Sequence, residues 1–168
     1  MYWILVVMGF FVAVAAALIV GGLATPREHT AIRSRRYSAS PEHVWAIVRD
    51  VGNYASWRED MIDSELVAAA TNEPQVQWRE ITSGGSVTFG IVDEQPPVRM
   101  TARVMDEDLS WNGTWTWEVK PVDGGAMLTI TERGNVGNPI FRFIGTHFIG
   151  FTREIDRYLR GVEDALHT

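Results

Sequence analysis

The chain has 168 residues, a length that suits one ordinary globular domain, and it contains no cysteine. The lack of cysteine excludes disulfides, thiolate zinc sites, iron–sulfur clusters and a cysteine nucleophile. The formal net charge of -6 argues against nucleic acid as a partner, because phosphate binding needs a basic surface.

The chain begins with an apolar run that has the length of a membrane span. Residues 2–23 carry no charged side chain, and as a helix they would span about 33 Å, close to one hydrocarbon core. A cleaved signal peptide ending near Ala24 is the alternative. The run is longer than the usual apolar region of a signal peptide, and no Lys or Arg precedes it. We therefore expect a transmembrane anchor over residues 1–25 that contacts the bilayer through residues 2–23.

Arginines that follow this run bear on the orientation of the anchor. Arg27, Arg33, Arg35 and Arg36 come after it, whereas only the terminal amine precedes it. The positive-inside rule then predicts a single-pass protein of the cell membrane with its remaining domain in the cytoplasm. The alternative is that three of these arginines belong to a folded strand and carry no topological signal.

The next segments predict a strand and two helices. Residues 29–37 are a plausible first strand. Ser40 and Pro41 then form an N-cap and a proline at the first helical position, and apolar residues follow at helical spacing as far as Val51. A short second helix is expected over residues 54–58.

From residue 64 to residue 133 the apolar period changes to two, and turn residues separate the runs. This pattern predicts a meander of about six antiparallel strands. A helix that opens with proline is expected over residues 139–166, with an apolar stripe that includes Phe148 and Ile155. The predicted architecture of residues 26–168 is α+β of the helix-grip type, a curved antiparallel sheet wrapped around a long C-terminal helix.

Turn positions predict which strand residues share a face. A turn at residues 123–124 places Trp117 opposite Ile130 and Trp115 opposite Glu132. A turn at residues 84–85 brings a second set of side chains to the inner face, and a pair formed by Glu94 and Arg99 should lie outside. That second inner set is Trp78, Glu80, Val87, Phe89, Ile91 and Asp93.

Two parts of the chain carry a resemblance to a known family. The segment SPEHVWAIVRD at residues 40–50 resembles the opening of the START-like superfamily, and more narrowly of its polyketide cyclase/dehydrase (SRPBCC) branch. The pair of runs WTWEV and LTITE at residues 115–119 and 128–132, followed by a terminal helix, is also similar. The resemblance implies a hydrophobic pocket between sheet and C-terminal helix that binds lipids, sterols, polyketides or other apolar molecules. No catalytic motif of the family is matched.

The expected binding site combines apolar side chains with two carboxylates. Glu80 and Glu132 are its polar groups, and in an apolar cavity at least one should titrate above the usual value for a carboxyl group. Either could act as a general acid or base, or it could be paired and structural. The expected ligand-binding residues are Trp78, Glu80, Phe89, Ile91, Trp115, Trp117, Ile130, Glu132, Phe148, Phe151 and Ile155.

Motifs for several chemistries are missing from the sequence. It has no glycine-rich phosphate loop, no His-Glu-x-x-His and no Gly-x-Ser-x-Gly, and its four histidines are scattered. We expect no metal and no cofactor. The favoured function is a membrane-anchored binding protein for an apolar small molecule or lipid. The alternatives are a cyclase or dehydratase that uses a cavity carboxylate, and an interaction domain with a filled core.

Overall fold

A computed structural model describes residues 2–70 and 73–167; Met1 and Thr168, the ends of the predicted anchor and domain, lie outside the described residues. The sheet has seven antiparallel strands in the order β1-β7-β6-β5-β4-β3-β2. The strands are β1 (Glu28–Tyr37), β2 (Met61–Val67), β3 (Gln77–Thr82), β4 (Gly85–Gln95), β5 (Arg99–Val104), β6 (Trp111–Val122) and β7 (Gly125–Val136). The helices are α1 (Tyr2–Ala24), α2 (Pro41–Arg49), the 3₁₀ helix η1 (Val51–Ser56), α3 (Pro139–Ile144), the π-helix η2 (Gly145–Ile149) and α4 (Arg153–Ala165).

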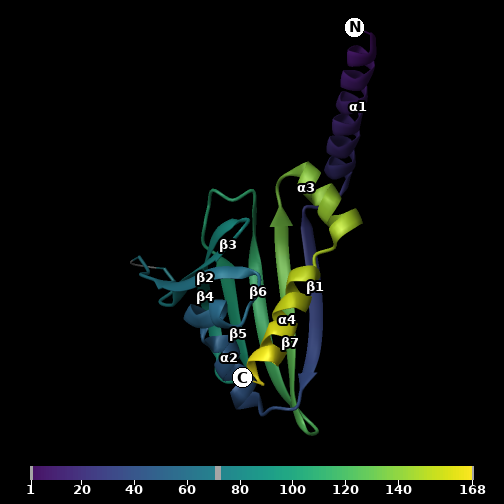
Figure 1. The fold of residues 1–168 in the computed structure, drawn as a ribbon. Coiled ribbons are helices and arrows are strands. Elements are labelled where there is room, and N and C mark those ends of the chain that lie inside the picture. Colours follow the sequence, from purple (N-terminus) through teal and green to yellow (C-terminus); the bar gives the residue numbers. More distant parts are fainter. Residues whose placement is uncertain (1, 71–72, 168) are drawn as a thin grey trace.

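The helix-grip architecture predicted from the sequence is confirmed. The curved sheet wraps around α4, and α2 closes one end of the domain (Figure 1). The core between these layers contains Val48 from α2, Trp117 and Leu128 from the sheet, and Ile155 and Leu159 from α4, all of them buried. Burial of these apolar faces is the main force that holds helix and sheet together.

The start of α2 follows the expected capping chemistry. The Ser40 hydroxyl accepts a hydrogen bond from the backbone N–H of His43 at 3.2 Å, and Pro41 occupies the first turn. The buried side of the helix presents Val44 and Val48 to the core. The second short helix is also present, although it begins at Val51 as a 3₁₀ helix.

The prediction of a single helix over residues 139–166 is wrong. The structure has α3, the π-helix η2, a break, and then α4. Gly150 ends η2 with a φ of 77°, a left-handed conformation that glycine adopts without strain. The apolar stripe is therefore not continuous: Phe148 is 74% exposed, whereas Ile155 is fully buried.

The hairpin registers are confirmed for β6 and β7, where Trp115 faces Glu132, and for β3 and β4, where Glu80 faces Val87. Beyond Ile91, however, the expected register is wrong. A β-bulge between Ile91 and Asp93 turns Asp93 to the outer face.

The bulge also changes two ion pairs. Asp93 bonds to Arg99 at 2.6 Å on the outside, in place of the expected Glu94–Arg99 pair. Glu94 shifts to the other face and pairs with Arg49 of α2.

Helix α1 extends away from the sheet (Figure 1). Among the described residues it is the one helix long and apolar enough to cross a membrane. Two glycines near its end let α3 pack against it. A Cβ on Gly22 would lie 1.9 Å from the Pro139 carbonyl oxygen, and a Cβ on Gly21 would lie 2.7 Å from the Phe143 ring.

Candidate binding cavity

A cavity of about 1280 Å³ lies between the sheet and α4. Its walls come from every strand of the sheet except β5, from the segment that joins η1 to β2, and from α3 and α4. Aromatic side chains that line it are Trp57, Phe89, Trp111, Trp115, Trp117, Phe141, Phe151 and Tyr158. A curved sheet that wraps around a helix leaves such a space where the facing side chains do not fill it.

The structure brings six of the eleven predicted site residues to the cavity wall. They are Glu80, Phe89, Trp115, Trp117, Glu132 and Phe151. Trp78, Ile130 and Ile155 lie instead within the core, each with none of its surface exposed, so they support the wall from behind. Ile91 is half-buried beside the core and does not line the cavity. Phe148 is the clearest correction, because the break at Gly150 leaves it on the outer surface.

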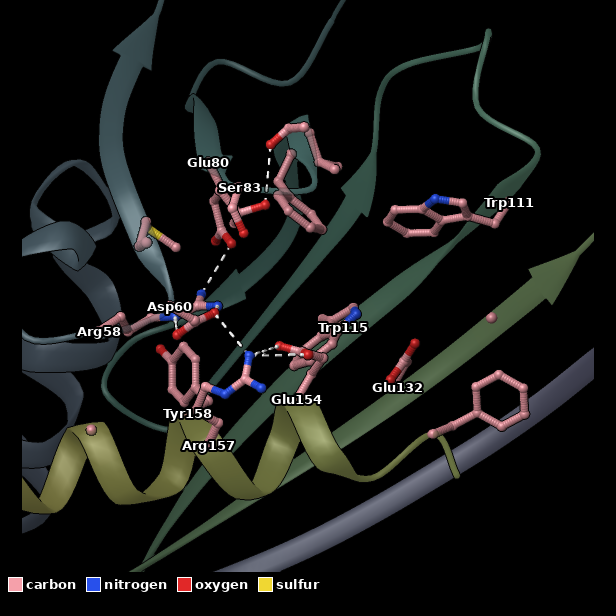
Figure 2. Close-up of a pocket in the computed structure, with 18 of the residues that line it drawn as sticks. Arg58, Asp60, Glu80, Ser83, Trp111, Trp115, Glu132, Glu154, Arg157 and Tyr158 are labelled. Atoms are coloured by element: carbon pink, nitrogen blue, oxygen red, sulfur yellow. Dashed lines mark hydrogen bonds and ion pairs between the residues drawn. The ribbon is translucent and has the colours of Figure 1, made fainter. Parts of the chain in front are cut away.

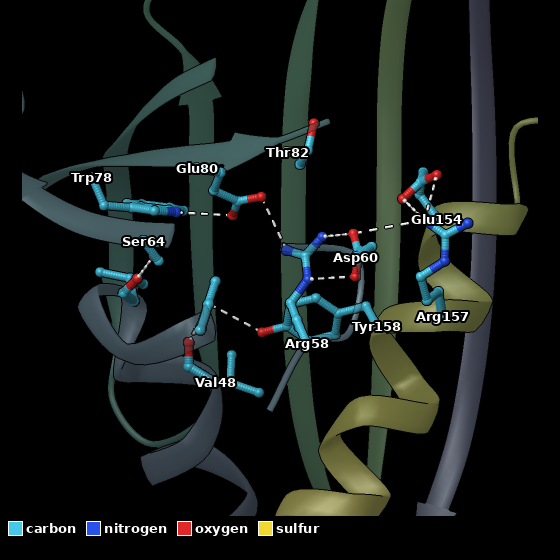
Figure 3. A network of polar contacts seen from close by, with 12 residues as sticks. Val48, Arg58, Asp60, Ser64, Trp78, Glu80, Thr82, Glu154, Arg157 and Tyr158 are labelled. Carbon is cyan, nitrogen blue, oxygen red and sulfur yellow. Dashed lines mark hydrogen bonds and ion pairs between the residues drawn. The ribbon is translucent and has the colours of Figure 1, made fainter. Parts of the chain in front are cut away.

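A charged network centred on Arg58 forms one side of the cavity (Figure 3). The Arg58 guanidinium donates to Asp60 at 2.8 Å and to Glu80 at 3.0 Å. The indole N–H of Trp78 donates to the other oxygen of Glu80 at 3.0 Å. Both Glu80 oxygens therefore have a partner. Of the two roles that the sequence allowed, acid–base catalysis or a paired structural carboxylate, this geometry matches the second.

The network continues to α4 through Arg157. Its guanidinium lies 3.7 Å from the Asp60 carboxylate and 3.2 Å from that of Glu154. Burial disfavours the charge of Arg58, but Glu80 and Asp60 outweigh this effect and raise the pKa of Arg58. Burial also acts to raise the pKa of Asp60, and the hydrogen bond from Arg58 reverses this and lowers it. Each charged side chain of the network therefore lies beside one of opposite sign.

The second polar feature of the cavity is a pair formed by His29 and Glu132. His29 Nε2 lies 3.4 Å from Glu132 Oε1, and both side chains are largely buried. Burial, and next the charge of Glu154, raise the pKa of Glu132 to about 7, while burial lowers the pKa of His29. The expectation that one cavity carboxyl titrates high is met by Glu132.

The place of His29 depends on a glycine and an aromatic ring. Strand pairing sets His29 opposite Gly134, where a Cβ would lie 2.3 Å from the imidazole. The ring of Phe151 stacks on the imidazole at 3.6 Å between centroids.

Glu132 and Trp111 lie across the cavity from the Arg58 network (Figure 2). The cavity therefore has two separate polar regions with aromatic side chains between them.

A comparison with protein families matches residues 28–167 to the model of the family described as polyketide cyclase/dehydrase and lipid transport. The chain belongs to this family. No curated protein matches the sequence. The resemblance expected from residues 40–50 and from the two runs of β6 and β7 is thus confirmed.

Solved structures with the same fold include an aromatase/cyclase and a norcoclaurine synthase. The ZhuI aromatase/cyclase of Streptomyces sp. R1128 is 13% identical with a TM-score of 0.65, over 83% of this chain and 94% of that one. Norcoclaurine synthase of Thalictrum flavum, in complex with dopamine and hydroxybenzaldehyde, is 8% identical with a TM-score of 0.65, over 89% and 91%. A protein of Thermus thermophilus is 19% identical with a TM-score of 0.64, over 81% and 95%. At these identities the likeness concerns the fold.

Several residues that line the cavity of this chain were not predicted from the sequence. Arg58 and Asp60 follow a short helix, in a segment where no apolar periodicity predicts which way a side chain points. The signal that could have identified them is the charged triplet Arg-Glu-Asp, which directly follows an aromatic-rich turn. His29 was not singled out because its partner Glu132 is distant in sequence. Within residues 2–70 and 73–167, no cluster of three His, Asp or Glu side chains has the arrangement of a metal site.

Proposed function

We propose that the protein is a membrane-anchored binding protein that holds a hydrophobic small molecule or lipid in the cavity. The observation that carries the proposal is the cavity itself. Its volume of about 1280 Å³ exceeds the range of about 300–1,000 Å³ common for small-molecule sites. Aromatic walls favour an apolar ligand, and the polar regions at Arg58 and at Glu132 favour one that also carries a polar group.

Two buried polar atoms support a ligand with hydrogen-bonding groups. Trp117 Nε1 and His29 Nδ1 are buried and have no hydrogen-bond partner within the described part of the chain. A buried polar group left unpaired costs about 1–3 kcal/mol. Both residues line the cavity, so a small rotation of the Trp117 ring would let its indole N–H donate a hydrogen bond to a carbonyl or hydroxyl oxygen of a ligand.

The membrane part of the proposal rests on α1. The helix has 23 residues, and its side chains lie almost entirely outside the folded domain. An apolar helix of this length that is not covered by protein suits a bilayer. We further propose that the protein is a single-pass protein of the cell membrane with its domain in the cytoplasm.

Three of the four arginines that follow the span have partners within the domain. Arg33 contacts Asp156 at 3.3 Å, Arg35 pairs with Glu163, and Arg36 donates to a backbone carbonyl. Arg27 remains beside the span and supports the cytoplasmic orientation. A C-terminal fluorescent-protein fusion is expected to be bright and a C-terminal alkaline phosphatase fusion inactive; the reverse pattern would overturn the orientation and leave the binding proposal intact.

Native mass spectrometry of the full chain, extracted from membranes in mild detergent, tests the binding proposal. We expect a bound apolar molecule.

Glu132→Leu should weaken retention of a ligand that carries a polar group by about fivefold to tenfold, as for one lost hydrogen bond, and should keep or raise thermal stability. Thr131→Leu is the matched control, because adjacent strand residues point to opposite faces. A cavity that retains no apolar molecule from the membrane and binds none added in vitro would refute the proposal.

The His29–Glu132 pair favours a second candidate, an enzyme of the cyclase or dehydratase type. A carboxyl group with a pKa of about 7 beside an imidazole is suited to proton transfer at neutral pH. Glu132→Gln should then abolish turnover of a bound substrate while binding is kept. The third alternative, an interaction domain with a filled core, finds no support in a cavity of this volume.

A further inference from the structure

The segment between β7 and α4 exposes large apolar side chains. Four of the seven phenylalanines of the chain fall within residues 141–151. In the structure Phe141, Phe148 and Ile149 are 62%, 74% and 57% exposed. Arg142, the one Lys, Arg, Asp or Glu between Arg133 and Arg153, is buried at 3% exposure. This is the reverse of a helix that faces water, which turns its charge outward and its aromatic rings inward.

The exposed apolar side chains lie beside the proposed membrane span. The Gly21 and Gly22 contacts with Phe143 and Pro139 bring α3 against the end of α1. Leu23 of α1 is itself 67% exposed. The apolar surface of α1 therefore continues onto α3 and η2.

The same segment also borders the cavity. Phe141 lines it, together with Trp111 at the start of β6 and Val136 at the end of β7. These strand ends lie at the end of the domain from which α1 projects (Figure 1). The part of the cavity wall nearest to α1 is therefore made by the apolar segment.

We propose that α3 and η2 form a bilayer-docking surface, with Phe148 and Ile149 inserted into the membrane that α1 spans. Aromatic and aliphatic side chains on a short amphipathic segment favour the boundary between headgroups and acyl chains. Docking in this way places the Phe141 end of the cavity against lipid. An apolar ligand could then pass between bilayer and cavity without crossing water. The inference rests on the proposed membrane anchor and extends it to a second membrane contact.

Site-directed labelling tests this surface, and the absence of native cysteine makes single labels straightforward. Full-length Phe148→Cys, labelled with the polarity-sensitive fluorophore NBD, is reconstituted in phosphatidylcholine–phosphatidylglycerol vesicles. We expect emission at shorter wavelength than that of the free fluorophore in buffer, and loss of fluorescence when lipids with nitroxide-labelled acyl chains are included. Ile149→Cys is a second site in case the first label disturbs the surface. Lys120→Cys, exposed at the far hairpin, is the matched control and should show neither change.

A label at Val12→Cys separates this inference from the proposed anchor. Quenching at residue 12 with water-like emission at residues 148 and 149 would overturn the docking surface and leave the anchor in place. No quenching at residue 12, 148 or 149 would overturn both. Water-like emission at residues 148 and 149 that becomes apolar only when a cell extract is added would refute docking on lipid and assign the surface to a protein partner.

Discussion

Replacing Arg58 with methionine is expected to lower the free energy of unfolding by about 3–5 kcal/mol, the range for breaking a buried ion pair from one side. The Arg58 side chain is 10% exposed, and its partners Asp60 and Glu80 are similarly buried. Methionine fills much of the same space but leaves two carboxylates in the cavity wall without their main counter-charge. Denaturant unfolding of the full chain in mild detergent measures the effect.

A surface pair offers the matched control for this prediction. Arg79→Met removes the partner of Glu65, where both side chains are about half exposed, and should cost less than about 1 kcal/mol. Adding Asp60→Asn and Glu80→Gln to Arg58→Met should recover part of the loss, because the uncompensated charges disappear. Equal losses for Arg58→Met and Arg79→Met would show that the Arg58 network does not hold the cavity wall.

The second large effect concerns the pH dependence of stability through Glu132. Its pKa is about 7 in the folded protein, against 4.5 for an unperturbed carboxyl group. The folded state therefore holds this proton more tightly, and the resulting stability is fully present below about pH 4.5. It is lost as the pH rises through 7, and the total change is about 3 kcal/mol.

Glu132→Gln should remove this dependence. Relative to the unmodified chain, the variant should gain about 3 kcal/mol in free energy of unfolding between pH 4.5 and pH 8. The comparison is made at each pH, because His29 titrates in both proteins and its contribution then largely cancels. A stability difference that stays constant over this range would show that Glu132 has the same pKa in the folded and unfolded states.

Local features of the chain were predictable because short-range physics decides them. The hydroxyl of Ser40 and the ring of Pro41 start α2 wherever the helix packs. A tight turn and the period of two were enough to pair Trp115 with Glu132, because strand alternation then determines each face. Helix α1 follows directly from a long run without charge.

Two local irregularities escaped prediction, and both move predicted residues. The bulge next to Ile91 sends Asp93 outward, and the break at Gly150 leaves Phe148 exposed. Neither irregularity changes the apolar pattern of the sequence. The position of the bulge depends on how β4 pairs with its neighbouring strands, and the break at Gly150 depends on how α3 packs against α1. Both are properties of the folded chain.

The charge arrangement of the cavity was decided by the tertiary structure alone. The sequence determined that Glu80 and Glu132 would face inward, and it left open whether each is paired or protonated. Arg58 reaches Glu80 from the segment after η1, which supplies a counter-charge. Pairing of β1 with β7 brings His29 to Glu132 across most of the chain. The ionisation of a buried carboxyl group depends on its nearest charges and its exposure to water, and both are set only once distant segments have packed together.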